Sequence, residues 1–214
     1  MKYTHVLFDL DGTLTDPFEG VVNSLRFALA RFGIREEEEA VFRQFIGPPL
    51  EKTFRDYYRL SADDTQRAVG YYREYYAEKG VYENKLYEGI DGVLQALRNK
   101  NIHCSVATSK LRESAVKALQ NFHLDAYFLC VAGSRPDGTL SEKEDIIRFI
   151  ISEYKPEKNK TIMVGDRKYD IEGARKNGIE SAAVSYGYGS REELEKENPA
   201  YFCDSPRDLL RVLI

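Results

Sequence analysis

Short apolar segments alternate with longer amphipathic segments through most of this 214-residue chain. The apolar segments have the length of buried strands, and the amphipathic ones repeat with the period of a helix packed on one face. This alternation predicts an α/β fold: a parallel sheet with helices on both faces. The expected strands are residues 6–8, 102–107, 128–132, 161–164, 181–184 and, more weakly, 201–203. The expected helices are residues 92–100, 113–122, 142–154 and 170–177.

One interval interrupts the alternation. From residue 16 to the strand that begins at residue 102 there is no predicted strand, although a simple βαβ unit needs only about 30 residues. The excess length has helical periodicity, so we expect a small helical domain, residues 17–86, inserted into a core formed by residues 1–16 and 87–214. The apolar stripes of its two clearest helices are Val21, Leu25, Ala28, Leu29 and Phe32, and Ala68, Tyr72 and Tyr75 with the Lys79 stem.

Local signals mark several helix ends. Ser141 with Glu144, and Ser190 with Glu193, have the spacing of a capping box at a helix start. Gly178 predicts a helix stop, because glycine adopts the left-handed conformation of a C-terminal cap without strain.

Charge and composition exclude several functional classes. A net charge of −4, with lysines and arginines scattered along the chain, gives no basic surface for nucleic acid or an anionic membrane. No apolar run approaches a membrane span, and the N-terminal residues lack the apolar region of a signal peptide. Cys104, Cys130 and Cys203 are far apart in apolar stretches and are expected to be buried, reduced thiols. We therefore expect a cytoplasmic protein.

Polar side chains follow three of the expected strands directly. Asp9 and Asp11 follow the first strand, Thr108 follows the strand at 102–107, and Asp166 and Asp170 follow the strand at 161–164. In an open parallel sheet, ligands bind at the edge where the strands reach their carboxyl ends. Aspartate and threonine are also common helix caps and turn residues, which explains any one of these positions but not their convergence.

Carboxylates gathered at one edge repel one another. Two unit charges 4 Å apart cost about 4 kcal/mol at an effective dielectric constant of 20. A bound cation offsets this cost, and an all-oxygen ligand set beside a phosphate favours Mg²⁺.

The segment DLDGTLTD at residues 9–16 resembles the first motif of the haloacid dehalogenase superfamily, in its phosphoglycolate-phosphatase-like branch. Thr108 matches the second motif, Lys143 the third, and Asp166 with Asp170 the fourth. The motifs span nearly the whole chain, and the helical insertion lies where this branch carries its cap. The resemblance implies a Rossmann-like core, a helical cap domain, Mg²⁺ as cofactor and phosphatase activity.

The resemblance also implies a role for each matched residue. Asp9 would attack phosphorus and form an aspartyl phosphate, since a carboxylate is already ionised at neutral pH. Asp11 would protonate the leaving oxygen, then activate water, while its main-chain carbonyl binds the metal. Asp9 and Asp166 would bind Mg²⁺, with Asp170 as a further ligand or a hydrogen-bond acceptor behind the site. Gly12 would allow a sharp turn and leave main-chain amides free for phosphate oxygens.

Thr108 and Lys143 would hold phosphate oxygens and offset their growing charge. Alternatives remain for both: Ser109 is one position away, and Lys110 competes with Lys143. The family often has proline after the third-motif lysine, whereas this chain reads SEKED at residues 141–145, so a solvated lysine is a second interpretation. Asp170 is also interpretable as a helix cap.

The expected function is Mg²⁺-dependent hydrolysis of a small phosphorylated metabolite, of a phosphoglycolate phosphatase or 5′-nucleotidase type, by a monomer or homodimer. A phosphomutase would use the same aspartyl phosphate. A non-catalytic regulatory binding protein would share the fold but is expected to lose a motif carboxylate, and none is missing. Substrate choice is expected to depend on the cap, where residues 45–50 (FIGPPL) are predicted to reach the leaving group.

Two other features are interpreted as structural. The segment GYGSRE at residues 187–192 lacks the third glycine of a dinucleotide loop and is predicted to be a flexible turn that flanks the site. His5, His103 and His123 have no metal-ligand spacing.

Overall fold

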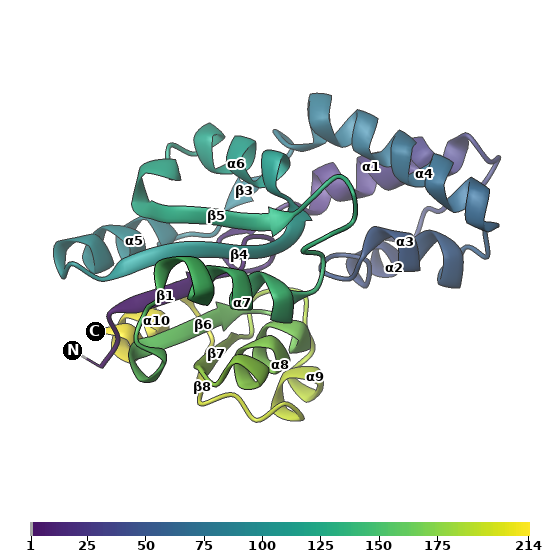
Figure 1. Ribbon diagram of the computed structural model, residues 1–214. Coiled ribbons are helices and arrows are strands. Elements are labelled where there is room, and N and C mark those ends of the chain that lie inside the picture. The colour runs from purple at the N-terminus through teal and green to yellow at the C-terminus, as the bar shows by residue number, and fades with distance from the viewer. Residues whose placement is uncertain (1) are drawn as a thin grey trace. The chain divides into compact units, whose positions relative to one another are not determined.

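The computed structural model describes residues 2–214, so Met1 of the expected core domain lies outside the described residues. The chain forms two compact units (Figure 1). The first comprises Met1–Asp16 and Leu86–Ile214, and the second comprises Pro17–Lys85.

A six-stranded parallel sheet with the order β5-β4-β1-β6-β7-β8 forms the centre of the first unit (Figure 1). Its strands are β1 (His5–Phe8), β4 (His103–Leu111), β5 (Phe128–Ser134), β6 (Thr161–Gly165), β7 (Glu180–Val184) and β8 (Tyr201–Cys203). Phe8 at the end of β1 is level with Val106 of β4 and Val164 of β6. Asp9 and Asp166 follow β1 and β6 directly, whereas Thr108, expected to follow its strand, lies within the longer β4. All three therefore lie at one edge of the sheet. All six predicted strands are present, and the predicted α/β class is confirmed.

Helices follow the strands as the sequence pattern predicts. Those of the first unit are α5 (Ile90–Asn99), α6 (Arg112–Asn121), α7 (Lys143–Tyr154), α8 (Lys168–Asn177), α9 (Arg191–Glu195) and α10 (Pro206–Leu213), with 3₁₀ turns η3 (Asp125–Tyr127) and η4 (Lys158–Lys160). Helix α7 packs against α8, and α5 packs against α10. Leu7 and Met163 of the sheet join Ile146, Ile147 and Ile150 of α7 in a buried apolar cluster.

The predicted helix ends are partly correct. Ser190 caps α9 by accepting a hydrogen bond from the Glu193 amide at 3.1 Å. Gly178 ends α8 with a φ of 71°, as predicted. The predicted capping role of Ser141 is wrong, because the N-cap of α7 is Glu142 and its side chain makes no capping hydrogen bond.

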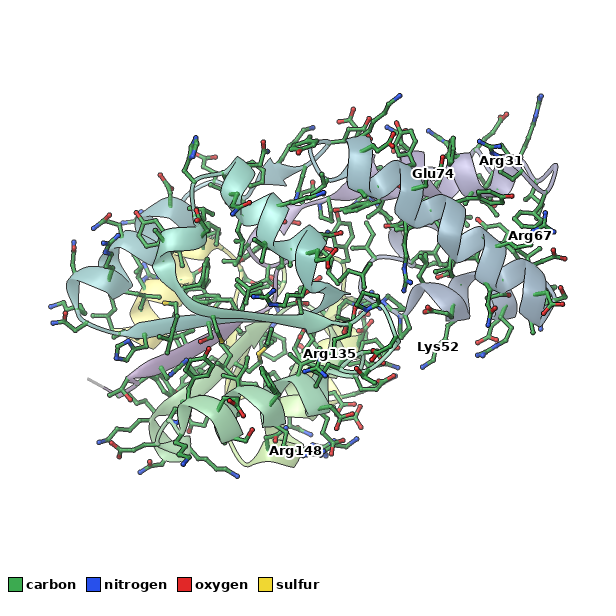
Figure 2. All side chains as sticks on the ribbon, turned by 45° about the horizontal axis from the view of Figure 1, so that its top comes forward. Arg31, Lys52, Arg67, Glu74, Arg135 and Arg148 are labelled. Carbon is green, nitrogen blue, oxygen red and sulfur yellow. The ribbon has the colours of Figure 1, made fainter. Side chains whose placement is uncertain are left out.

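The second unit is helical. It contains α1 (Phe18–Ala30), α2 (Glu39–Arg43), α3 (Leu50–Lys52), η1 (Thr53–Tyr57), α4 (Ala62–Tyr75) and η2 (Tyr76–Gly80). Helix α1 packs against α4, and a side chain at Gly20 would place Cβ 2.0 Å from the Gly80 carbonyl oxygen. Lys79, expected on the apolar stripe, is exposed, with Nζ 5.7 Å from the Tyr75 ring centroid. Arg31, labelled in Figure 2, lies over aromatic rings at the surface of this unit.

Three details differ from the sequence expectations. Two short strands, β2 (Thr15–Asp16) and β3 (Lys85–Leu86), pair within the interval where no strand is predicted, because two residues carry no detectable period. Cys104 and Cys203 are buried free thiols, but Cys130 is only partly buried, so the expectation of three buried cysteines is wrong there. None of the helices in residues 2–214 is both long and apolar enough to cross a membrane.

Candidate active site

Three buried carboxylates meet at the edge where β1 and β6 end. Asp9 follows β1, Asp166 follows β6, and Asp170 lies in the first turn of α8. One oxygen from each carboxylate lies within 4.8 Å of the others. Asp9 is 6% exposed, Asp166 0% and Asp170 1%. The parallel register of β1 and β6 produces this convergence, as the strand assignments predict.

Lys143 lies inside this cluster. Its Nζ atom is 2.9 Å from Asp9 Oδ1 and 2.7 Å from Asp170 Oδ1, and it donates to the Ala107 carbonyl oxygen at 2.8 Å. An ammonium group carries three donors, and these three acceptors match them. Burial lowers the pKa of Lys143, but the carboxylates of Asp170 and Asp9 outweigh burial and hold that pKa above its ordinary value. The interpretation of Lys143 as a solvated lysine is wrong.

Asp170 combines the two interpretations that the sequence leaves open. Its Oδ2 atom accepts a hydrogen bond from the Arg167 amide at 3.0 Å and completes the capping box of α8. Its Oδ1 atom contacts Lys143 within the cluster. Burial raises the pKa of Asp170 to about 6, against the opposing effect of Lys143. Gly165 makes room for this carboxyl, since a Cβ there would lie 2.1 Å from Asp170 Cγ.

Asp166 has two hydrogen-bond donors and two negative neighbours. The Tyr188 amide donates to Oδ2 at 2.8 Å, and Thr13 Oγ1 lies 3.4 Å from Oδ1. Burial, followed by the charges of Asp9 and Asp170, raises the pKa of Asp166 well above its usual range. The negative charges of these buried carboxylates repel one another. A hard divalent cation would remove this repulsion and favour the ionised form of each carboxylate, so the group fits such a cation.

Asp11 is paired separately. Lys110 Nζ donates to Asp11 Oδ1 at 2.8 Å and to Oδ2 at 2.6 Å, and both side chains are largely buried. Burial raises the pKa of Asp11, while Lys110 acts in the opposite direction. The side chain of Asp11 is thus separate from the three-carboxylate cluster, and two different lysines contact the two motif aspartates.

The remaining predicted residues surround this edge. Thr108 is buried near the end of β4, where its Oγ1 accepts a hydrogen bond from the Lys110 amide at 3.2 Å, and Ser109 is half-buried. Gly12 turns the chain with a φ of 85°, and a Cβ there would lie 2.2 Å from Asp166 Oδ2. The Gly12 amide donates to the Thr15 carbonyl at 2.7 Å. That amide is engaged within its own loop, contrary to the expectation that it is free.

Sequence reasoning missed the part played by the segment after β7. Gly187 and Gly189 lie against Asp166, and the amide of Tyr188 between them is its hydrogen-bond donor. The segment is a turn beside the site, as predicted, and in addition it supplies this hydrogen bond to Asp166. Its signal was two glycines flanking a tyrosine just past the end of a strand.

In the second unit, residues 44–49 connect α2 to α3, and Leu50 is the first residue of α3. Phe45 packs edge-to-face on Tyr57 with ring centroids 5.0 Å apart, whereas Ile46 is 2% exposed in the interior of the unit. Phe45 also lines an open hollow of about 280 Å³ beside Lys52, which is labelled in Figure 2. The other residues that line the hollow are Gln44, Pro48, Thr53, Asp56 and Tyr57.

Known proteins are similar to this chain in sequence and fold. Residues 6–184 match the family model described as haloacid dehalogenase-like hydrolase. A 5′-nucleotidase of Pseudomonas aeruginosa is 40% identical over 213 residues, which are 100% of this chain and 96% of that protein. The tyrosine-protein kinase PtkA of Mycobacterium tuberculosis is 35% identical over 89% of this chain but only 65% of its own length. The crystal structure of a predicted phosphatase from Clostridium acetobutylicum aligns with a TM-score of 0.95 and 41% identity, covering 100% of this chain and 99% of that one.

Proposed function

The chain belongs to the haloacid dehalogenase-like hydrolase family and is a phosphatase, and from this premise we propose that it hydrolyses a small phosphomonoester through an aspartyl phosphate on Asp9. The observation that carries the proposal is the buried group of Asp9, Asp166 and Asp170 around Lys143. If Lys143 served only in a structural ion pair, one carboxylate would be enough to balance its charge. Three carboxylates at the ligand-binding edge of the sheet are instead suited to a cation and a phosphoryl group.

The contacts of Asp9 favour one oxygen as the nucleophile. Lys143 Nζ and the Leu10 amide, at 2.9 Å and 2.7 Å, both contact Oδ1. These two donors fix the rotation of the carboxylate and draw negative charge toward Oδ1. We assign the attack on phosphorus to Oδ2, with the P–O bond to the leaving group breaking as the new O–P bond forms.

Asp11 is assigned the proton transfers. Its carboxyl gives a proton to the departing oxygen, then takes one from the water that hydrolyses the aspartyl phosphate, so the proton count closes over a cycle. Burial raises the pKa of Asp11 and favours the protonated form that the first step needs. Lys110, which bonds both oxygens of Asp11, orients the carboxyl group.

The proposed metal site uses carboxylate oxygens of Asp9, Asp166 and Asp170 and the main-chain carbonyl of Asp11. When bound, Mg²⁺ offsets the charge of the phosphoryl oxygens and of the surrounding carboxylates. Thr108 is assigned to a phosphate oxygen. Because the three donors of Lys143 already have protein acceptors, we assign to it the orientation of Asp9 as well as charge compensation.

The substrate class is a small organic phosphate. The similarity to a 5′-nucleotidase makes nucleoside 5′-monophosphates the first substrates to assay. The helical unit Pro17–Lys85 is proposed to act as the cap that selects among them. Free cysteines support a reducing, cytoplasmic setting, and a monomer or homodimer is proposed.

The test is release of inorganic phosphate from a panel of nucleoside monophosphates, sugar phosphates, phosphoglycolate and pyrophosphate. Activity should disappear in excess chelator and return with Mg²⁺, while Ca²⁺ should substitute poorly because it prefers looser coordination. Transfer of the group to a second position of a sugar phosphate, without release of phosphate, would instead establish a phosphomutase. Full activity in excess chelator would overturn the proposed metal site.

A further inference from the structure

The segment after β7 touches two loops that carry the proposed catalytic residues. Tyr186 donates its hydroxyl to the Thr13 carbonyl at 3.0 Å, in the loop after β1. Tyr188 donates its amide to Asp166 Oδ2 at 2.8 Å, in the loop after β6. The hydroxyl of Tyr188 also donates to Asp16 Oδ1, at β2. Tyr188 thus connects the carboxylate at the end of β6 to the chain that follows β1.

Gly187 and Gly189 are required because any larger side chain would clash with neighbouring atoms. A Cβ at Gly187 would lie 2.4 Å from Asp166 Cβ and 2.4 Å from the Gly12 carbonyl oxygen, and a Cβ at Gly189 would lie 2.0 Å from the Asp166 carbonyl oxygen. Neither glycine has a positive φ, so backbone conformation does not explain them. The close approach is what brings the Tyr188 amide within hydrogen-bond distance of Asp166.

Helix α9, which follows the segment, is also hydrogen-bonded to the chain after Asp166. Glu193 accepts hydrogen bonds from Arg167 Nε and from the Lys168 amide, both at 3.0 Å. The Tyr188 phenol is protonated at neutral pH without any shift and donates to Asp16 Oδ1. Side-chain hydrogen bonds therefore hold the chain on both sides of the Tyr188 amide, from Tyr186 before it and from Glu193 after it.

We propose that Tyr188 is a positioning residue for Asp166: its hydroxyl bond to Asp16 fixes the loop whose main-chain N–H orients the Asp166 carboxylate toward the metal. The inference rests on the magnesium site proposed above. Oδ2 accepts from the Tyr188 amide, whereas the contact of Oδ1 within residues 2–214 is the distant Thr13 hydroxyl at 3.4 Å, so Oδ1 is the oxygen suited to the cation. Hydrogen bonds of this kind set the orientation and basicity of metal ligands.

The test measures Mg²⁺ binding directly, from the increase in unfolding temperature as Mg²⁺ is added to substrate-free protein. Tyr188→Phe removes one hydroxyl and keeps the ring and the amide. Its Mg²⁺ dissociation constant should rise about 10-fold, the scale typical of groups that orient metal ligands. The unfolding temperature without Mg²⁺ should fall by only a few degrees, because the fold loses one hydrogen bond to a charged acceptor and keeps its packing. The matched control is Gly92→Ala in α5, where an added Cβ meets no atom within 4 Å.

Variants of Asp16 separate positioning from general loop stability. Asp16→Asn retains an acceptor oxygen and should bind Mg²⁺ nearly as the wild type does. Asp16→Ala should weaken binding as Tyr188→Phe does, and the double variant should be no weaker than either single variant. An unchanged Mg²⁺ dissociation constant in Tyr188→Phe, with a lower unfolding temperature, would show that the residue is merely structural. A wild-type protein that does not bind Mg²⁺ would overturn both this inference and the proposed metal site.

Discussion

Lys143 and Asp9 form a buried ion pair in which Nζ lies 2.9 Å from Oδ1, and neither side chain is more than 8% exposed. The two residues lie 134 positions apart in the sequence. They meet because the first residue of α7, Lys143, lies in space beside Asp9, which follows β1. The pair places a fixed positive charge against one oxygen of the proposed nucleophile and leaves the other to react.

Replacement of Lys143 tests this arrangement. Lys143→Met should lower turnover by at least about 100-fold, because it removes the charge that orients Asp9 and offsets the phosphoryl oxygens. It should also lower the free energy of unfolding by about 3 kcal/mol, since it leaves two buried carboxylates without their cation. Steady-state kinetics and chemical denaturation measure the two effects. Lys117→Met, on the exposed face of α6, is the control, and equal turnover in both variants would contradict the assignment.

Replacement of Asp11 separates the two chemical steps. Asp11→Asn should impair cleavage of an alkyl phosphate far more than that of nitrophenyl phosphate, whose leaving group needs no proton. Hydrolysis of the aspartyl phosphate should slow for both substrates, because the water loses its base. Rapid-mixing kinetics with the two substrates measure each step. Equal impairment of both substrates in the first step would indicate that Asp11 serves only to hold the loop.

The strands and their order of appearance were predictable because each is marked by a local apolar run. The meeting of Asp9 with Asp166 was predictable as well, because parallel strands deliver their ends to one edge. The environment of Lys143 was not predictable, since its sequence neighbours are polar and its acceptors lie just after β1, in β4 and in α8. A residue whose partners all lie far away in the sequence leaves no local signal.

The segment after β7 was predicted as a turn beside the site, but its contact with Asp166 was not predictable for the same reason. The glycines at 187 and 189 are needed because the Asp166 backbone and side chain lie against them, and that neighbour is absent from the local sequence. Ser141 shows the opposite error: its spacing to Glu144 fits a capping box, but α7 begins one residue later than that box requires. Local spacing indicates a cap only when the backbone conformation agrees.

The stability of the protein should depend on His5 in a defined pH range. His5 is 4% exposed, with Nε2 2.9 Å from Ser105 Oγ, and burial with a smaller contribution from His103 lowers the pKa of His5 to about 4. The unfolded chain has the ordinary value of about 6.5. Between pH 6.5 and pH 4 the unfolded chain therefore takes up a proton that the folded state does not. The free energy of unfolding should fall by up to about 3 kcal/mol as the pH falls through this range.

Denaturation at several pH values checks this dependence against His5→Gln, which carries no titrating group. The variant should lose less stability than the wild type between pH 6.5 and pH 4, and both should have the same pH dependence above pH 7. Identical slopes in the lower range would show that His5 titrates normally in the folded protein.

Phe45 and Ile46 should behave differently although they are adjacent. Phe45 lines the hollow of the second unit, so Phe45→Ala should change the order in which substrates are preferred. Ile46 is buried within the unit, and Ile46→Ala should cost about 2–4 kcal/mol of stability while the order stays the same. Specificity constants for the substrate panel and thermal unfolding distinguish the two. A change in substrate order with Ile46→Ala alone would place the specificity contact elsewhere.

The central claim is that Asp9 is phosphorylated during turnover. The most direct measurement is acid quenching of the enzyme during steady-state turnover, followed by mass spectrometry of the peptide that contains residues 9–16. With nitrophenyl phosphate as substrate, the account predicts the added mass of one phosphoryl group on Asp9. More of it should accumulate in Asp11→Asn, because hydrolysis of the intermediate slows while this leaving group needs no proton, and none should form in Asp9→Asn, which should remain folded but inactive. Phosphate on another residue, or an Asp9→Asn variant that turns over at the wild-type rate without reverting to aspartate, would contradict it.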